Sequence, residues 1–364
     1  MNPDVVPRFL KSKFALRSSL AILAAALLLS IGRVGNAQPS PPPAMAEDQR
    51  MLPYIAPGQL VDIGGRHINM HCAGTGGPTV VLMGGLFSWS LVWYKTQPVI
   101  AHQTRVCAFD RAAYGFSDPA PQPQIISDVV EDLHKALHTG SITGPYVLVG
   151  HSLGGLEARV YAQRWPEDVV GMVLVDTSPA GEGLIDEAQP DFDEAAGRES
   201  YIAHLLHCAS LARHGDFQQS NAEPSQELTN CSAVLPKDTP AAFKTVWPRF
   251  FTANYFEAKA SLLWGLYNHQ YDSADHHRLG AMPLVVLSIE HPWGYDNNTP
   301  AGERLDRSYG KIWNDLHADL ARLSSQGVHR VIKQAGHEIQ LDQPQAVIDA
   351  VDEVLRLLHT GAKP

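Results

Sequence analysis

The chain has 364 residues, of which 45% are hydrophobic and 18% are charged, and its formal net charge at pH 7 is −10. These proportions are typical of a folded globular protein and exclude a disordered or low-complexity chain. The acidic balance argues against nucleic acid as a partner.

The start of the chain has the layout of an export signal. Basic residues, among them Lys11 and Arg17, precede the apolar run LAILAAALLLSIG at residues 20–32, and the small residue Ala37 follows. The apolar run is shorter than the roughly 20 residues needed to cross a bilayer. We therefore expect residues 1–37 to be a signal peptide cleaved after Ala37. The mature protein would be periplasmic or secreted, without stable membrane insertion; an uncleaved membrane anchor is the alternative.

The rest of the chain alternates between apolar runs and amphipathic stretches. Residues 38–51 are rich in proline and are predicted to form an extended linker. The later runs are continuous and rich in Val, Ile and Leu, as expected for a sheet that is covered on both faces. They lie at residues 60–72, which read as a hairpin turning at Gly64 and Gly65, and at 79–83, 104–110, 146–150, 169–176, 283–289 and 329–333.

Two helices have recognisable ends. Residues 127–140 begin with Ser127 as a candidate N-cap and end at Gly140. Residues 344–361 begin with Pro344 in the first turn, and apolar residues recur there at helical spacing. The succession of strand and helix predicts a doubly wound α/β fold with a mostly parallel sheet.

One interval breaks this alternation. About 100 residues follow the strand that ends at Asp176, which is too long for a loop in a compact domain. Residues 177–279 are therefore predicted to form a helical cap on a core made of residues 52–176 and 280–364. We expect most aromatic residues of the cap to pack onto the core, and a minority to line an apolar substrate site. These residues are Trp247, Phe250, Phe251, Tyr255, Phe256, Trp264 and Tyr267.

Ser152 is the candidate nucleophile. It lies in the sequence GHSLG, between the apolar strand 146–150 and an amphipathic helix. Gly-x-Ser-x-Gly in this setting predicts a strand-to-helix turn so sharp that only small residues fit at 150 and 154. The serine hydroxyl would then be exposed at the carboxyl edge of the sheet. A serine at such a turn needs a base to accept its proton.

His337 is the candidate base. The chain contains 17 histidines, so a histidine by itself carries no information. His337 alone lies in the loop between the last predicted strand, 329–333, and the last predicted helix, which starts at Pro344. That loop opens on the same edge of the sheet as Ser152.

Taken together and in this order, four phrases resemble the α/β-hydrolase fold family, and the resemblance extends over residues 58–359. The phrases are VVLMGGLFSWSLVW (80–93), RVCAFDRAAYGFSDP (105–119), GPYVLVGHSLGGLEARVYAQRWPEDVVGMVLVDTSP (144–179) and AGHEIQLDQP (335–344). The resemblance implies an oxyanion hole made by the backbone N–H groups of Leu153 and Leu86. Gly84 stands where the family usually has histidine.

The resemblance leaves three candidates for the acid that orients His337. In some relatives the acid follows the strand after the nucleophile helix, where this chain has Asp176. In many others it follows the strand after the cap, where this chain has Glu290 and then Asp296. Asp176 is the first choice, and its alternative role is to brace the start of the cap.

These residues together predict a serine hydrolase that cleaves carboxylic esters through an acyl-enzyme. The expected substrate is a small ester-like molecule with an apolar part, and neither a cofactor nor a metal ion is needed. Peptidase, amidase or carbon–carbon bond hydrolase activity would use the same residues. A hydrolase-like binding protein without turnover is the alternative from another class.

The four cysteines form two pairs, for which different states are expected. Cys208 and Cys231 lie 23 positions apart in the cap, and export would permit a disulfide between them. Cys72 and Cys107 lie in apolar strand-like runs, where we expect buried thiols. The spacing of cysteine and histidine offers no support for a zinc site.

Overall fold

The structure is a computed structural model that describes residues 48–179, 194–217, 225–232, 235, 238–268, 277–291 and 300–361. The expected signal peptide and most of the expected linker lie outside the described residues. The end of that linker is described, and there Gln49 begins a 3-10 helix, η1 (Gln49–Ile55), in which Met51 and Tyr54 are buried. Packed structure therefore starts before residue 52, because these two side chains join the core. None of the described helices is both long and apolar enough to cross a membrane.

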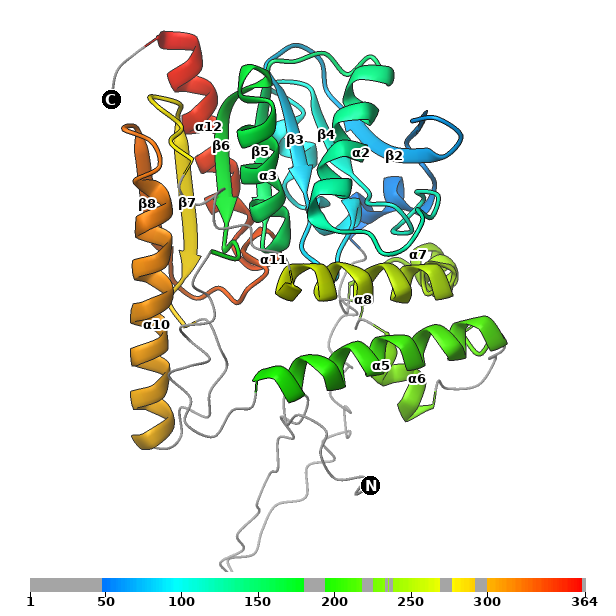
Figure 1. Ribbon diagram of the computed structural model, residues 1–364. Helices are drawn as coiled ribbons and strands as arrows, with labels where there is room; N and C mark the ends of the chain where they lie inside the picture. The colour runs from blue at the N-terminus through cyan, green and yellow to red at the C-terminus, as the bar shows by residue number, and fades with distance from the viewer. Residues whose placement is uncertain are drawn as a thin grey trace, which may run out of the picture. The chain divides into compact units, whose positions relative to one another are not determined.

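An eight-stranded sheet runs through the protein in the order β1-β2-β4-β3-β5-β6-β7-β8 (Figure 1). Strand β2 pairs antiparallel with β1 and β4, and the remaining neighbours are parallel. The predicted doubly wound, mostly parallel sheet is confirmed. The strands are β1 (Gln59–Asp62), β2 (His67–Ala73), β3 (Thr79–Met83), β4 (Val106–Phe109), β5 (Tyr146–His151), β6 (Val169–Val175), β7 (Leu284–Ile289) and β8 (Gly327–Ile332).

Helices cover both faces of this sheet, which explains the continuous apolar strands. Alternate residues of β3 belong to different apolar clusters, with Val81 on one face and Val80 on the other. In Figure 1, α2, α3 and α10 lie in front of the sheet and α12 lies behind it. The helices and short turns of the core are η2 (Ser90–Trp93), α1 (Gln97–Ile100), α2 (Ile126–Thr139), α3 (Leu153–Arg164), η3 (Pro166–Asp168), α10 (Pro300–Ala321), α11 (Ile339–Asp342) and α12 (Pro344–Thr360).

The start of α2 differs from the prediction, because Ile125 and not Ser127 is the N-cap. The carboxylate of Asp128 accepts the backbone N–H of Ile125 at 2.9 Å and so completes the helix end. Ile126, the first residue of the helix, is buried in the core. The predicted C-cap at Gly140 is confirmed.

A helical insertion separates β6 from β7 in the sequence. Its described elements are α5 (Glu194–His214), α6 (Gln226–Cys231), α7 (Ala241–Val246), η4 (Trp247–Phe250) and α8 (Ala253–Asn268). Figure 1 shows α8 crossing beneath the carboxyl ends of the strands, with α5 running beside it. The ring of Trp89, from the loop after β3, packs against Trp247 and Phe250 at centroid distances of 5.4 and 5.0 Å. Aromatic side chains therefore make much of the contact between the insertion and the core, and Ser261 of α8 adds hydrogen bonds with the backbone of Gln124.

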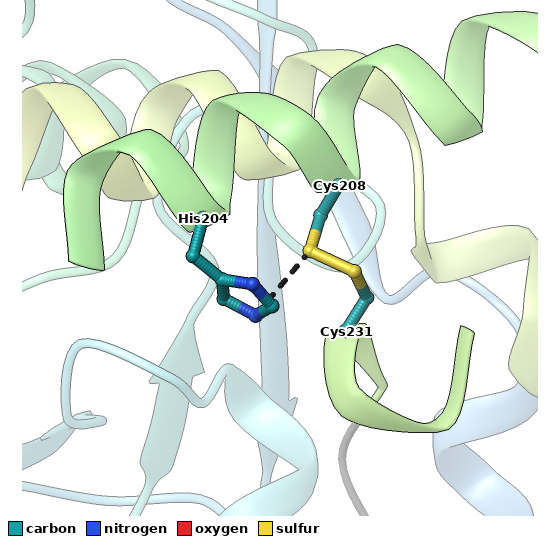
Figure 2. A group of neighbouring side chains, drawn as sticks. All are labelled: His204, Cys208 and Cys231. Atoms are coloured by element: carbon teal, nitrogen blue, oxygen red, sulfur yellow. Dashed lines mark hydrogen bonds between the residues drawn. A yellow bond between two sulfur atoms is a disulfide. The ribbon is translucent and has the colours of Figure 1, made fainter. Parts of the chain in front are cut away.

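Two disulfides are present. The expected bridge between Cys208 and Cys231 joins α5 to α6, and Nε2 of His204 lies 3.5 Å from Sγ of Cys208 (Figure 2). Because the two sulfur atoms are bonded to each other, this group offers no thiolates to a metal ion.

The expectation of free thiols at Cys72 and Cys107 is wrong, because these residues form the second disulfide. They face each other in the antiparallel pair β2 and β4, with Cα atoms 4.0 Å apart. The pairing of these two strands, which are distant in sequence, creates a contact that is not evident from the sequence of either apolar run.

Candidate active site

Ser152 lies at the turn between β5 and α3, with φ 53° and ψ −122°. This backbone conformation is rare for a residue with a side chain. A Cβ atom on Gly150 would lie 2.3 Å from the carbonyl oxygen of Gly154, and one on Gly154 would lie 2.3 Å from that of Met83. Both flanking positions therefore require glycine, and the turn places Ser152 at the carboxyl edge of the sheet, with Leu153 as the first residue of α3.

The loop after β3 contacts this turn. A Cβ atom on Gly85 would lie 3.2 Å from the Cβ atom of Ser152. Three successive carbonyl groups of the loop accept hydrogen bonds from buried side chains. Arg111 donates to Gly84 and Gly85 at 2.5 and 3.0 Å. Tyr114 donates to the carbonyl of Leu86 at 2.9 Å. These bonds fix the peptide planes of the loop beside Ser152.

Arg111 itself is held by Glu157 of α3. The guanidinium donates two hydrogen bonds to the carboxylate, at 2.6 and 2.7 Å, and both side chains are buried. Burial alone would lower the pKa of Arg111, but the charge of Glu157 raises it above the usual value. Arg111 and Tyr114 support the candidate site through the loop after β3, and neither was identified from the sequence. The available signal was a charged residue directly after a buried strand, in DRAAYG.

Asp176 follows β6 and is fully buried, with φ 42°. Its Oδ2 atom accepts a hydrogen bond from Nδ1 of His337 at 2.7 Å. Its Oδ1 atom accepts the indole N–H of Trp313 at 2.8 Å and the backbone N–H of Ile289 at 3.1 Å. Burial would raise the pKa of Asp176, but the hydrogen bond and charge of His337 outweigh it, with smaller contributions from His317 and Trp313, and the pKa is lowered.

The other two candidates for the acid are not in this position. Glu290 has a side chain that is 44% exposed, and its carboxylate lies 3.7 Å from Nε2 of His291. Asp296 lies outside the described residues. Of the carboxylates that the structure describes, Asp176 is the one bonded to the ring of His337.

His337 lies in the loop between β8 and the short helix α11, which precedes α12. Its backbone carbonyl accepts a hydrogen bond from Nε2 of His151 at 2.9 Å, and the centroids of the two imidazole rings are 4.6 Å apart. His337 is therefore anchored to the residue that precedes Ser152. With Nδ1 bonded to a carboxylate, the neutral imidazole presents Nε2 as a proton acceptor.

Two groups of described residues have the side-chain types of metal ligands, and neither includes Ser152, Asp176 or His337. One is the disulfide group of Figure 2. The other consists of His134, His138 and Asp168, which lie on and beside α2. The serine, histidine and aspartate described above can move a proton without a metal ion.

Comparison with known proteins identifies the fold to which this site belongs. The sequence model of the alpha/beta hydrolase fold matches residues 78–291. The uncharacterized protein YbdG of Bacillus subtilis (strain 168) is 29% identical over 121 residues, which are 33% of this chain and 37% of YbdG. The present chain therefore matches less than half of that relative.

Two solved structures extend the similarity across the chain. A thermophilic esterase from Thermogutta terrifontis is 20% identical and has a TM-score of 0.56, covering 84% of this chain and 98% of the esterase. A bromoperoxidase from Bacillus anthracis is 16% identical, also with a TM-score of 0.56, and covers 82% of this chain and 99% of that protein. Similarity at this level shows a common fold, which hosts different reactions. With the family match extending over more than half of its length, this chain belongs to the α/β-hydrolase fold family.

Proposed function

We propose that this protein is an exported serine hydrolase that cleaves carboxylic esters through an acyl-enzyme at Ser152. The hydrogen bond between Asp176 and His337, beside the constrained turn of Ser152, is the observation that carries the proposal. A buried carboxylate, a histidine that it orients and a serine at a sharp strand-to-helix turn are the parts of a nucleophilic acyl-transfer site.

The reaction would proceed in two halves. In the first, Nε2 of His337 takes the proton of Ser152, and Oγ forms a bond to the acyl carbon. The N–H groups of Leu86 and Leu153 would stabilise the negative oxygen. The ester C–O bond then breaks, and His337 returns its proton to the departing alcohol. In the second half, water gives a proton to His337 and its oxygen attacks the acyl carbon. The bond between the acyl carbon and Oγ then breaks, the acid leaves, and His337 returns the proton to Oγ of Ser152.

Three further points support the finer parts of the proposal. Serine, unlike the carboxylate nucleophile of an epoxide hydrolase, forms an acyl-enzyme rather than an alkyl-enzyme ester. The esterase from Thermogutta terrifontis shares the fold. Disulfides at Cys72–Cys107 and Cys208–Cys231 are typical of an oxidising compartment, which agrees with export.

Hydrolysis of p-nitrophenyl esters of increasing chain length by the mature protein tests the reaction. Ser152→Ala should abolish turnover and labelling by a fluorophosphonate, because both need the serine oxygen. Ser325→Ala, at an exposed serine outside the site, is the matched control and should retain both. The proposal fails if the wild-type protein neither turns over any ester nor reacts with the fluorophosphonate.

Fractionation of a Gram-negative host that expresses the full chain tests export. We expect activity in the periplasm or the medium, and a mature N-terminus at Gln38. Recovery of the uncleaved chain in the membrane fraction would favour the anchor instead.

A further inference from the structure

Lys259 of α8 is a buried cation next to the proposed oxyanion loop. Its side chain is 6% exposed, although lysine is normally among the most exposed residues. The ammonium nitrogen lies 4.5 Å from the ring centroid of Phe87, 4.9 Å from that of Tyr255 and 5.7 Å from that of Phe256. Among the described residues, the contacts of this nitrogen are aromatic rings, and no carboxylate lies within ion-pair distance.

Such a position is unfavourable for a charged group. An ammonium ion taken out of water needs a counter-ion, and the attraction of aromatic rings compensates only part of the lost hydration. Burial accordingly lowers the pKa of Lys259 to about 7. Near neutral pH the amine is thus close to half charged, and an anion placed beside it would favour the charged form.

Phe87 connects Lys259 to the site. It directly follows Leu86, the proposed oxyanion donor, and its carbonyl accepts a hydrogen bond from the hydroxyl of Tyr255 at 3.4 Å. The Phe87 side chain is 46% exposed, and its ring meets that of Tyr201, which is 37% exposed, edge to face at 5.9 Å. The buried ammonium group therefore borders a solvent-exposed aromatic surface within the loop that contacts Ser152.

We propose that Lys259 binds a carboxylate of the substrate, so that the preferred esters are half-esters of short dicarboxylic acids. The carboxylate would supply the counter-ion that no described residue provides, and the exposed rings of Phe87 and Tyr201 would contact the methylene groups between the two ends. This inference rests on the proposed ester hydrolysis at Ser152 and names its substrate class.

The test compares mono(4-nitrophenyl) glutarate with its methyl ester, which has the same acyl chain without the charge. The wild-type protein should show the higher kcat/KM for the acid. In Lys259→Met, a neutral residue of similar length, the ratio of the two kcat/KM values should fall by about 10- to 100-fold, mainly through KM. Lys259→Arg should retain a preference for the acid, because it keeps the cation.

Lys244→Met is the matched control, because it removes a lysine from the same insertion at an exposed position on α7. It should leave the ratio as in the wild type, since an exposed charge is screened by solvent. An equal ratio in the wild type and Lys259→Met would overturn the inference, and so would a wild-type protein that prefers the methyl ester. Circular dichroism of each variant checks that the fold is retained.

Calorimetric titration with glutarate separates this inference from the proposed reaction. Binding should be weakened by Lys259→Met and not by Lys244→Met. Glutarate binding that depends on Lys259, in a protein that hydrolyses no ester, would retain the carboxylate site and refute the hydrolase. Suppose instead that esters are hydrolysed, that Lys259→Met leaves the preference for the acid unchanged, and that glutarate binding is independent of Lys259. That result would support the hydrolase and refute the carboxylate site.

Discussion

The interactions that position side chains at the carboxyl edge of the sheet differ from those that attach the helical insertion to the core. At the sheet edge, directional hydrogen bonds place each side chain, as with the three donors to Asp176 and the contacts of Arg111 with the loop after β3. The insertion meets the core largely through aromatic rings around Trp89, and Ser261 of α8 adds hydrogen bonds with the backbone of Gln124. Hydrogen bonds restrict geometry, whereas apolar contacts are non-directional and tolerate repacking. The positions of the side chains at the sheet edge are therefore more tightly restricted than those at the contact between the insertion and the core.

Asp176→Asn should have the largest effect on activity. The amide lacks the negative charge that orients and stabilises the His337 imidazolium, so kcat on p-nitrophenyl esters should fall by about 10⁴-fold. Glu290→Gln is the matched control, because its carboxylate is not bonded to the His337 ring and is exposed. An equal loss of kcat in both variants would contradict the role of Asp176.

Arg111→Met should affect both stability and rate. It leaves the buried carboxylate of Glu157 without its partner, so the free energy of unfolding in urea should fall by about 3–5 kcal/mol. It also releases the carbonyl groups of Gly84 and Gly85, so kcat should fall. Adding Glu157→Gln should recover part of the stability and none of the rate. Full recovery of kcat in the double variant would show that Arg111 does not position the loop.

Replacing Cys208 and Cys231 by alanine should loosen the insertion and spare the sheet. The bridge closes a segment with a sequence separation of 23 residues. For a segment of this length, its loss should destabilise by about 3 kcal/mol. We expect faster proteolysis within α5 and α6, with little change at the sheet. The variant without Cys72 and Cys107 is the comparison and should lower the thermal stability of the core. Identical cleavage patterns for the two variants would mean that the insertion and the core unfold as one unit.

The smallest expected effect is the contribution of Lys259 to the pH dependence of the free energy of unfolding. Its pKa is lowered in the folded state, so above about pH 7 the unfolded chain binds more protons than the folded one. The free energy of unfolding should therefore rise between pH 7.5 and 9.5, by at most about 1.4 kcal/mol per pH unit. Denaturant titrations should show a smaller slope with pH for Lys259→Met and an unchanged slope for Lys244→Met. Equal slopes in all three proteins would place Lys259 in a hydrated environment.

The strands of the sheet could be predicted from the sequence, since the apolar runs match them to within a few residues. It was less informative about the acid of the site. Asp176, Glu290 and Asp296 all follow predicted strands that end at the same edge, so the sequence ranked Asp176 first and left the other two open. The choice depends on Trp313 of α10 and on the β7 backbone, which donate to Asp176 after the chain has folded.

What the sequence determined by itself was local. The turn at Ser152 follows from the steric demands of five consecutive residues, and the helix at Pro344 from a fixed φ and an apolar repeat. Tertiary structure alone decided three contacts. These are the Cys72–Cys107 bridge, the hydrogen bonds of Arg111 to the loop after β3, and the packing of the buried Lys259 against the ring of Phe87. Each of these joins residues that the order of the strands or the docking of the insertion brings together. Short-range sterics can be read from neighbouring residues, whereas such contacts depend on the path of the whole chain.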